Sequence, residues 1–333
     1  MLGGGGMSNH GRTQAEVGDI LVAVIIPAYR VKNHVLQVIT GIPPLVGRIY
    51  VVDDACPDGS GRFVIEHNVD PRVSVIHNSI NLGVGGAVMA GYRAALADGA
   101  EIAVKLDGDG QMDASLIPRF IAPLLGKTAD YTKGNRFYDL RVLQKMPRVR
   151  LFGNAVLSFM AKLSTGYWNL FDPTNGYTAI SRRALSALPL ERISNRYFFE
   201  TDILFRLNSV RAVVRDVSME AVYADEQSNL KISKVIPEFL LAHTVNFGKR
   251  IFYNYFLRDF SVASVELVLG ILMFAFGAGF GAIQWAESIA SGVPSTAGSV
   301  MISAVSLIFG LQLLLAFLSY DITSTPKIPL NDS

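Results

Sequence analysis

The chain has 333 residues, half of them hydrophobic, and a formal net charge of +2. Its mean hydropathy of +0.33 is high for a purely soluble protein, so we expect membrane segments beside one large or two ordinary domains. The near-neutral net charge argues against nucleic acid as a partner. The single cysteine, Cys56, excludes an internal disulfide framework and agrees with a reducing compartment.

Residues 1–19 are glycine-rich and polar, and we expect a disordered leader there because a signal peptide needs a basic start and an apolar run. Beyond the leader, apolar runs alternate with helix-length segments. This alternation indicates an α/β fold with a parallel sheet that is covered on both faces. Ligands of such sheets bind at the carboxyl ends of the strands. The expected strands are residues 21–26, 48–52, 73–77 and 102–106, with an expected helix at 34–41 and another that ends at Ala97.

Two acids follow the fourth of these runs. Asp107 and Asp109 stand two residues apart, so in extended backbone they face the same side and can bind one hard cation. The glycines beside them let the backbone approach a ligand closely. A solvated Asp-Gly turn is the alternative, because Asp-x-Asp is common by chance.

A glycine-rich segment at 81–87 resembles a dinucleotide-binding fingerprint only in part. Counted from Gly83 and Gly85, the sixth position is Val88 instead of glycine, and the segment follows the third strand instead of the first. A nicotinamide enzyme is therefore disfavoured, and no Gly-x-x-x-x-Gly-Lys motif of a P-loop kinase occurs. The five histidines have no short ligand spacing, so we do not expect structural zinc.

Two long apolar segments lie near the C-terminus. Residues 262–283 carry one charge, Glu266, and residues 297–320 carry none. At about 1.5 Å per residue, each can cross a hydrocarbon core of roughly 30 Å. Two buried helices of a soluble domain are the alternative. Lys and Arg flank the pair on one side and are absent from the connection at 284–296, so the positive-inside rule predicts that both ends are cytoplasmic.

The segment before the first span is basic and aromatic, which is typical of an interfacial helix with rings at headgroup depth. A helix that packs on a partner is the alternative. We therefore expect interfacial helices at 233–260, a transmembrane hairpin at 261–322 and a cytoplasmic tail at 323–333.

Six short motifs occur in order between about residues 20 and 232: Pro27-Ala-Tyr29, Val51-Val-Asp53-Asp54, Asn81-Leu-Gly83-Val-Gly85, Asp107-Gly-Asp109-Gly-Gln111, Gly134-Asn-Arg136 and Asp172-Pro-Thr-Asn-Gly176. They resemble the motifs of inverting nucleotide-sugar glycosyltransferases of family 2. Within that family, the chain resembles the dolichol-phosphate mannose synthases and bacterial polyprenyl-phosphate glycosyltransferases. The resemblance implies a GT-A fold over residues 20–232, with a Rossmann-like, mostly parallel sheet and helices on both faces.

The resemblance also implies a donor site for a nucleoside-diphosphate sugar. Asp107 and Asp109 are its implied catalytic and metal-binding acids, with Mg²⁺ or Mn²⁺ as the cofactor. The implied contacts to the sugar nucleotide are Pro27, Tyr29, Asp53, Asp54, Gln111 and Lys231.

The chain departs from the family pattern in two places, one in the nucleotide site and one in a motif of polysaccharide polymerases. Family members usually continue Pro-x-Tyr with Asn-Glu, whereas this chain has Arg30-Val31, so one nucleotide-contacting carboxylate is missing. Arg30 is either a phosphate contact or a solvated charge. No Gln-x-x-Arg-Trp motif follows the acids, which argues against a cellulose- or hyaluronan-type polymerase.

The implied acceptor half begins at Arg136. The resemblance makes Arg136 and Arg150 ligands of a lipid phosphate, because the planar guanidinium binds phosphate bidentately. Asp202 is the best-matched acid near the transferred sugar, and Glu200 is the second candidate. Capping of a helix is the structural alternative for both acids.

The sequence therefore predicts a membrane enzyme that transfers one sugar, with inversion, to undecaprenyl or dolichyl phosphate at the cytoplasmic face. The expected partners are the sugar nucleotide, the polyprenyl phosphate and the bilayer, and the hairpin is a candidate homo-oligomer contact. Two alternatives stay open: a different membrane glycolipid as acceptor, and a non-catalytic scaffold that binds a nucleotide only.

Overall fold

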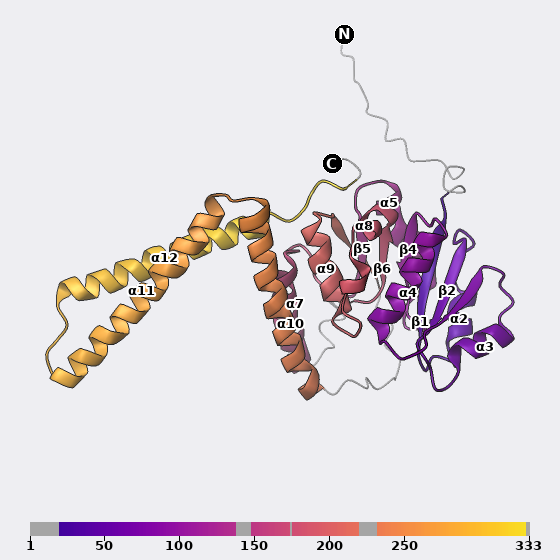
Figure 1. Ribbon diagram of the computed structural model, residues 1–333, viewed down its shortest axis with the longest axis horizontal. Helices are drawn as coiled ribbons and strands as arrows, with labels where there is room; N and C mark the ends of the chain where they lie inside the picture. The colour runs from indigo at the N-terminus through magenta and orange to yellow at the C-terminus, as the bar shows by residue number, and fades with distance from the viewer. Residues whose placement is uncertain (1–19, 138–147, 174, 220–231, 331–333) are drawn as a thin grey trace, which may run out of the picture. The chain divides into compact units, whose positions relative to one another are not determined.

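The computed structural model describes residues 20–137, 148–173, 175–219 and 232–330, so the expected leader and Lys231 lie outside it. The chain divides into two compact units (Figure 1). The first consists of Met1–Asn246 with Pro326–Ser333, and the second of Phe247–Thr325. The last residues thus belong to the same unit as the sheet.

The first unit is built around a seven-stranded sheet in the described part of the chain, in the order β3-β2-β1-β4-β6-β5-β7. The first four strands are mutually parallel, β6 is antiparallel to its neighbours β4 and β5, and β5 is parallel to β7. The strands are β1 (Val22–Ala28), β2 (Arg48–Asp53), β3 (Val73–His77), β4 (Ile102–Lys105), β5 (Tyr131–Asn135), β6 (Thr178–Ser181) and β7 (Val214–Ser218).

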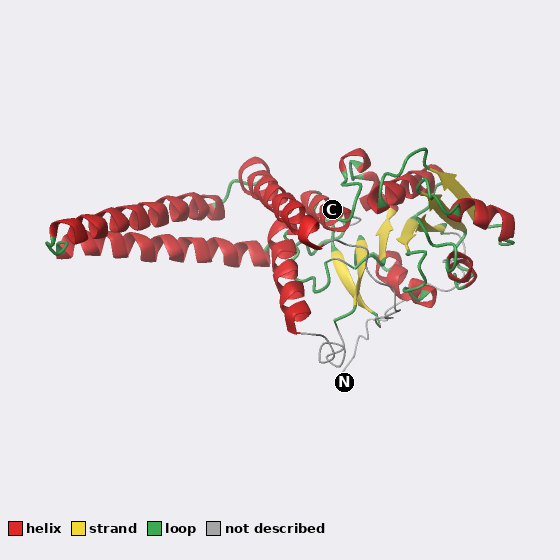
Figure 2. Cartoon of the chain, turned by 90° about the horizontal axis from the view of Figure 1, so that it is seen from below, coloured by secondary structure: helices red, strands yellow, loops and turns green. Residues whose placement is uncertain are grey.

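Helices cover both faces of this sheet (Figure 2). Two clusters of buried apolar residues form the core, one on each face of the sheet. Successive residues of β1 belong to different clusters, because successive side chains of a strand point to opposite faces. One face packs against α2 (Val35–Thr40), α3 (Ser60–His67) and α5 (Ile117–Leu125), and the other packs against α4 (Val84–Ala97), α8 (Arg182–Ser186) and α9 (Phe199–Ser209). The unit also contains the short helices η1 (Ala114–Leu116) and η2 (Leu190–Arg192) and the longer α7 (Arg148–Thr165).

The strand order reverses between β1 and β4, because β2 lies on one side of β1 and β4 on the other. Such a reversal leaves a crevice at the carboxyl ends of the strands. Since β6 is antiparallel, its amino end reaches the same edge of the sheet. This brings the Asp172–Gly176 motif, which precedes β6, next to the acids that follow β4.

The expected strands and helices of the first half are confirmed to within a few residues. At the expected interfacial segment, α10 (Ile232–Phe252) continues into a π-helical turn, η3 (Tyr253–Arg258). The division between the units falls within α10, beyond Asn246. The expected boundary of the catalytic domain at 232 stays a prediction.

The second unit contains α11 (Val262–Ser291) and α12 (Ala297–Thr323), and both are long and apolar enough to cross a membrane. Glycines let the two helices approach closely. A Cβ added at Gly310 would lie 2.5 Å from the backbone N of Phe274, and one added at Gly277 would lie 2.9 Å from the carbonyl oxygen of Ser303. The hydroxyl of Ser303 also donates to the Gly277 carbonyl at 2.8 Å. The pair therefore forms a tight hairpin.

Candidate active site

The expected nucleoside contacts gather where the strand order reverses. Pro27 lies in β1 opposite Val52, and Tyr29 follows the strand with 43% of its surface exposed. The guanidinium carbon of Arg30 lies 5.5 Å from the centre of the Tyr29 ring. The backbone of Arg30 is left-handed, with φ of 59°, which is unusual for a residue other than glycine. The crevice thus offers an exposed aromatic face beside a cation.

Asp53 and Asp54 are both buried, and each accepts hydrogen bonds from backbone amides. The carboxylate of Asp53 accepts from the amides of Cys56 at 2.7 Å and Gly61 at 2.6 Å, which fixes the start of α3. That of Asp54 accepts from the amide of Gly83 at 2.7 Å, which fixes the start of α4. Both acids therefore shape the loops of the crevice, and their contact with a nucleoside stays a prediction.

Asp107 lies beside a buried lysine that the sequence analysis did not single out. The Nζ of Lys105 is 2.7 Å from Oδ1 of Asp107 and 3.8 Å from Oε1 of Glu200. Burial opposes the charge of Lys105, but the two carboxylates outweigh it and raise the pKa of the lysine. The sequence feature that could have identified Lys105 is its position: a lysine within an apolar strand, two residues before the first acid of the motif.

Asp109 and Gln111 lie on the loop that follows, and both are partly exposed. The amide of Gln111 donates to Oδ1 of Asp109 at 3.0 Å. The described residues contain no group of three or more His, Cys, Asp or Glu side chains that could hold a metal. Two acids on an accessible loop still fit Mg²⁺ or Mn²⁺, because such ions often use one or two carboxylates and complete their shell with substrate phosphates and water.

Glu200 and Asp202 both lie in the first turn of α9, but they have different surroundings. Burial raises the pKa of Glu200, while Lys105 and Lys133 act in the opposite direction. The carboxylate of Asp202 accepts from the amide of Ser194 at 2.9 Å and from the side-chain amide of Asn246 at 3.2 Å. Asp202 is thus engaged in holding the fold together. Oε1 of Glu200 lies 3.8 Å from Nζ of Lys105. Which of the two acids lies near the transferred sugar stays a prediction.

A row of polar residues crosses the sheet on the face that α9 covers. Lys105 of β4 and Lys133 of β5 are both paired with Thr178 of β6, and Lys133 is also paired with Asp216 of β7. Lys133 is fully buried and donates to the carbonyl oxygen of Asn175. Burial lowers the pKa of Lys133 to about 8. The sequence did not reveal this row, because its members come from separate strands.

Arg136 is paired with an acid of the later Asp172–Gly176 motif. Its Nε and Nη2 lie 2.8 and 3.1 Å from the two carboxylate oxygens of Asp172, which is itself buried. The side-chain amide of Asn175 also donates to Asp172, at 3.2 Å. A Cβ added at Gly176 would lie 2.3 Å from Nζ of Lys105, so a larger residue there would displace the lysine from its position beside Asp107. The fold therefore joins two motifs that are far apart in the sequence.

The two implied lipid-phosphate ligands lie on different elements. Arg136 follows β5, with 37% of its side chain exposed, and Arg150 lies on α7. Their contact with a phosphate stays a prediction, as does that of Lys231, which lies outside the described residues.

Comparison with known proteins agrees with this geometry. The model of the glycosyl transferase family 2 matches residues 23–188. An undecaprenyl-phosphate mannosyltransferase of Micrococcus luteus is 32% identical over 196 residues, which cover 56% of this chain and 76% of that protein. The chain belongs to glycosyltransferase family 2. A UDP-N-acetylglucosamine–dolichyl-phosphate N-acetylglucosaminyltransferase of Methanococcus voltae is 28% identical over 223 residues, 63% of this chain and 88% of that protein.

The fold of this family 2 enzyme is the expected GT-A type. A crystal structure of glucosyl-3-phosphoglycerate synthase from Mycobacterium tuberculosis, in complex with Mn²⁺, UDP and glucosyl-3-phosphoglycerate, superimposes with a TM-score of 0.54. The match covers 73% of this chain and 87% of the synthase at 19% identity. At that identity, the likeness shows a shared fold only.

Proposed function

We propose that this family 2 enzyme transfers a single sugar from a nucleoside-diphosphate sugar to a polyprenyl phosphate, with inversion, at a membrane surface. The observation that carries the proposal is the combination of a family 2 domain, similar to two lipid-phosphate sugar transferases, with a hairpin of two apolar helices. The acids and lysines at the strand ends supply the chemistry that such a transfer needs.

The reaction is a direct displacement. An oxygen of the lipid phosphate attacks the anomeric carbon, and the bond from that carbon to the nucleoside diphosphate breaks on the opposite side. A divalent ion held by Asp107 and Asp109 would neutralise charge on the departing diphosphate. The Mn²⁺ and UDP bound to glucosyl-3-phosphoglycerate synthase are consistent with this choice of ion.

The side chains of the chain itself orient the reactants. The attacking phosphate oxygen is already anionic, so the transfer requires no strong general base. Glu200 can instead accept hydrogen bonds from the sugar, and the nearby Lys105 favours its ionised form. Arg136 and Arg150 would hold the lipid phosphate, with Arg136 oriented by its ion pair with Asp172. In-line positioning of this kind can supply a large share of the rate enhancement.

We also propose that the catalytic unit lies on the cytoplasmic face. The charge asymmetry around the hairpin supports this orientation. After α12 the chain rejoins the first unit, where the amide of Leu330 donates to the buried carboxylate of Asp130 at 3.1 Å. A chain that leaves and rejoins one unit crosses a bilayer an even number of times. The homo-oligomer contact through the hairpin stays a prediction.

A donor panel tests the function. The purified full-length protein is incubated with undecaprenyl phosphate and each of several radiolabelled UDP and GDP sugars, and label is measured in the lipid phase. We expect one donor to label the lipid. Labelling only of a glycolipid acceptor would support the first alternative, and nucleotide binding without any nucleotide release would support the scaffold.

A variant pair tests the acceptor site in the same assay. Arg150→Ala should raise the KM for lipid phosphate and leave nucleotide affinity unchanged, because the two phosphates occupy separate subsites. The exposed Arg192 lies on η2, and Arg192→Ala is the control. An equal loss of nucleotide affinity in Arg150→Ala would assign Arg150 to the donor site instead.

A further inference from the structure

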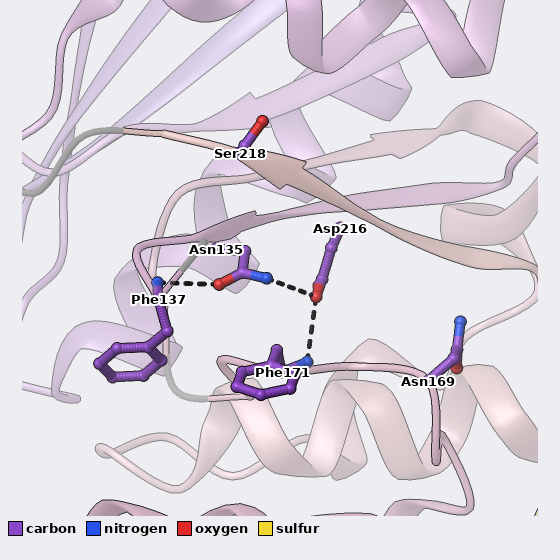
Figure 3. Close-up of a pocket in the computed structure, with 6 residues that line it drawn as sticks. All are labelled: Asn135, Phe137, Asn169, Phe171, Asp216 and Ser218. Carbon is purple, nitrogen blue, oxygen red and sulfur yellow. Dashed lines mark hydrogen bonds between the residues drawn. The ribbon is translucent and has the colours of Figure 1, made fainter. Parts of the chain in front are cut away.

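A cavity of about 450 Å³ lies at the carboxyl ends of β5 and β7 (Figure 3). Its walls combine two phenyl rings, two amides, one carboxylate and one hydroxyl. The lining residues are Asn135, Phe137, Asn169, Phe171, Asp216 and Ser218. None of them was singled out from the sequence as a site residue.

The carboxylate of Asp216 has one satisfied and one unsatisfied oxygen. Its Oδ2 accepts from the side-chain amide of Asn135 at 3.1 Å and from the backbone amide of Phe171 at 3.0 Å, as the dashed lines in Figure 3 show. Its Oδ1 is buried and has no hydrogen-bond partner among the described residues. A buried acceptor without a donor costs about 1–3 kcal/mol, and more if it is charged. The arrangement therefore requires a donor from a ligand or from water.

The walls of the cavity select the chemistry of this ligand. The unpaired Oδ1 of Asp216 needs a hydrogen-bond donor, which a sugar hydroxyl supplies and an ionised phosphate oxygen does not. A cation also borders the lining, because Arg119 donates to the Ser218 hydroxyl at 3.4 Å. Asn169 and Ser218 add side chains that can both donate and accept hydrogen bonds. Phe171 is 56% exposed, and its ring, whose centre lies 5.5 Å from Nζ of Lys162, offers an apolar face. A sugar is a neutral ring with many hydroxyls and an apolar C–H face. It therefore matches the free acceptor, the polar side chains and the aromatic ring of the cavity.

The cavity lies at the same edge of the sheet as the proposed reaction centre. Asp216 is the last member of the row that crosses the sheet through Thr178 and Lys133 from Lys105. Adjacent strands lie about 4.8 Å apart, so Asp216 is one strand from Lys133 and about 14 Å from Lys105. Asn135 and Phe171 also directly neighbour the paired residues Arg136 and Asp172 in the chain.

We propose that this cavity is a carbohydrate subsite, in which Oδ1 of Asp216 accepts a hydrogen bond from a sugar hydroxyl and the Phe171 ring packs against the C–H face of the sugar. The inference rests on the proposed function, since it deepens the recognition of substrate by the same site. Two sources share this chemistry: the sugar of the donor, and a sugar already carried by the lipid acceptor.

Asp216→Asn tests the subsite with little change in shape. The amide oxygen of asparagine can still accept from Asn135 and Phe171, while its NH₂ group replaces the free acceptor with a donor. We expect kcat/KM for the sugar-bearing substrate to fall roughly tenfold to a hundredfold, as for loss of a hydrogen bond to a charged group, with the affinity for free UDP or GDP unchanged. Glu191 is exposed and lies outside the cavity, so Glu191→Gln is the matched control.

Deoxy substrates then identify the hydroxyl and its source. Wild-type protein is assayed with 2-, 3-, 4- and 6-deoxy analogues of its sugar nucleotide, and with glycosylated and plain lipid acceptors. If the donor sugar occupies the cavity, one deoxy analogue should be a poorer substrate than the parent sugar nucleotide for the wild type but not for Asp216→Asn. A sugar on the acceptor predicts a preference for glycosylated lipid that Asp216→Asn loses. If neither difference distinguishes the two proteins, water satisfies Asp216 and the subsite is overturned.

A binding measurement separates this inference from the proposed function. Saturation-transfer NMR of methyl α-mannoside and methyl α-glucoside with the full-length protein in nanodiscs needs no transfer reaction. Binding that Asp216→Asn abolishes supports the subsite even if the lipid phosphate is never glycosylated. Glycosylation of the lipid without such binding, and without any effect of Asp216→Asn, overturns the subsite alone.

Discussion

Lys105 and Asp107 form an ion pair at the end of β4, with Nζ 2.7 Å from Oδ1 and the lysine almost completely buried. A carboxylate that already neutralises a lysine has less charge to offer a metal. We therefore expect Asp107 alone to bind a divalent ion weakly, so that binding also needs Asp109, the second acid of the motif.

The first prediction concerns the metal. Asp109→Asn should fold normally but lose roughly a hundredfold or more in turnover, because charge on the departing diphosphate is no longer compensated. Sugar transfer measures the turnover, and Mn²⁺ titration by electron paramagnetic resonance measures metal binding. The control is Asp113→Asn, since Asp113 is exposed. Excess EDTA should silence the wild type, and full activity in EDTA would rule out the metal role.

The second prediction concerns Lys105. Lys105→Met keeps most of the side-chain volume but removes the charge between Asp107 and Glu200. Without the cation, the pKa of Glu200 should rise further, because burial and Asp107 both oppose its ionisation. The acid limb of the pH–rate profile should therefore move to higher pH. Lys127 is exposed, and Lys127→Met should leave the profile unchanged. A uniform loss of activity without a shift would show that Lys105 does not control this titration.

The third prediction concerns the pH dependence of stability. Burial lowers the pKa of Lys133 to about 8 from a usual value of 10.5. Between these two values the unfolded chain binds more protons than the folded one, so the contribution of Lys133 to stability increases as pH rises. From about pH 7 to about pH 9.5, the wild type should gain about 2 kcal/mol relative to Lys133→Met. Unfolding followed by tryptophan fluorescence at both pH values measures this gain, and parallel pH curves for the two proteins would contradict it.

The fourth prediction concerns a buried ion pair in the second unit. Nη1 and Nη2 of Arg250 lie 2.6 and 3.0 Å from the carboxylate oxygens of Asp321, and the hydroxyl of Tyr255 donates to the same acid at 2.6 Å. Removal of one partner leaves an uncompensated buried charge, so Arg250→Met should destabilise the unit by about 3–5 kcal/mol. The exposed Lys249 supplies the control Lys249→Met.

The double variant Arg250→Met/Asp321→Leu completes this test, with thermal unfolding of the full chain in detergent as the measurement. It should recover much of the lost stability, because no unpaired charge remains. If the stability lost in the double variant equals the sum of the losses in Arg250→Met and Asp321→Leu, the two residues act independently.

The fifth prediction concerns membrane topology. In a Cys56→Ser background, a cysteine at Ser291, close to the connection between the spans, should react with an impermeant thiol reagent in intact cells. A cysteine at Ser333 should react only after the membrane is opened. The opposite pattern would place the catalytic unit away from the cytoplasmic pool of sugar nucleotides.

Local patterns in the sequence predicted the first half of the sheet well. The runs around β1 to β4 are apolar and end at proline or aspartate, and strand periodicity and turn chemistry depend on near neighbours in the chain. The position of Asp107 and Asp109 at a strand end followed from the same patterns. The two apolar helices of the hairpin were equally predictable, because length and composition decide whether a helix can span a bilayer.

The partners of the site residues could not be predicted in this way. Arg136 meets Asp172 because β6 pairs antiparallel with β5, and Lys105 meets Glu200 because α9 packs on that face of the sheet. The different surroundings of Glu200 and Asp202 likewise depend on how α9 packs in the fold.

The sequence by itself thus determined the family, the apolar strands, the acids at their ends and the membrane-length helices, since each of these depends on short-range order or composition. Only the tertiary structure decided which charges are paired, which carboxylates hold the fold, and where Asp216 leaves an acceptor unsatisfied. The physical reason is that hydrogen bonding, burial and pKa depend on distances between residues far apart in the chain, and strand order and register set those distances.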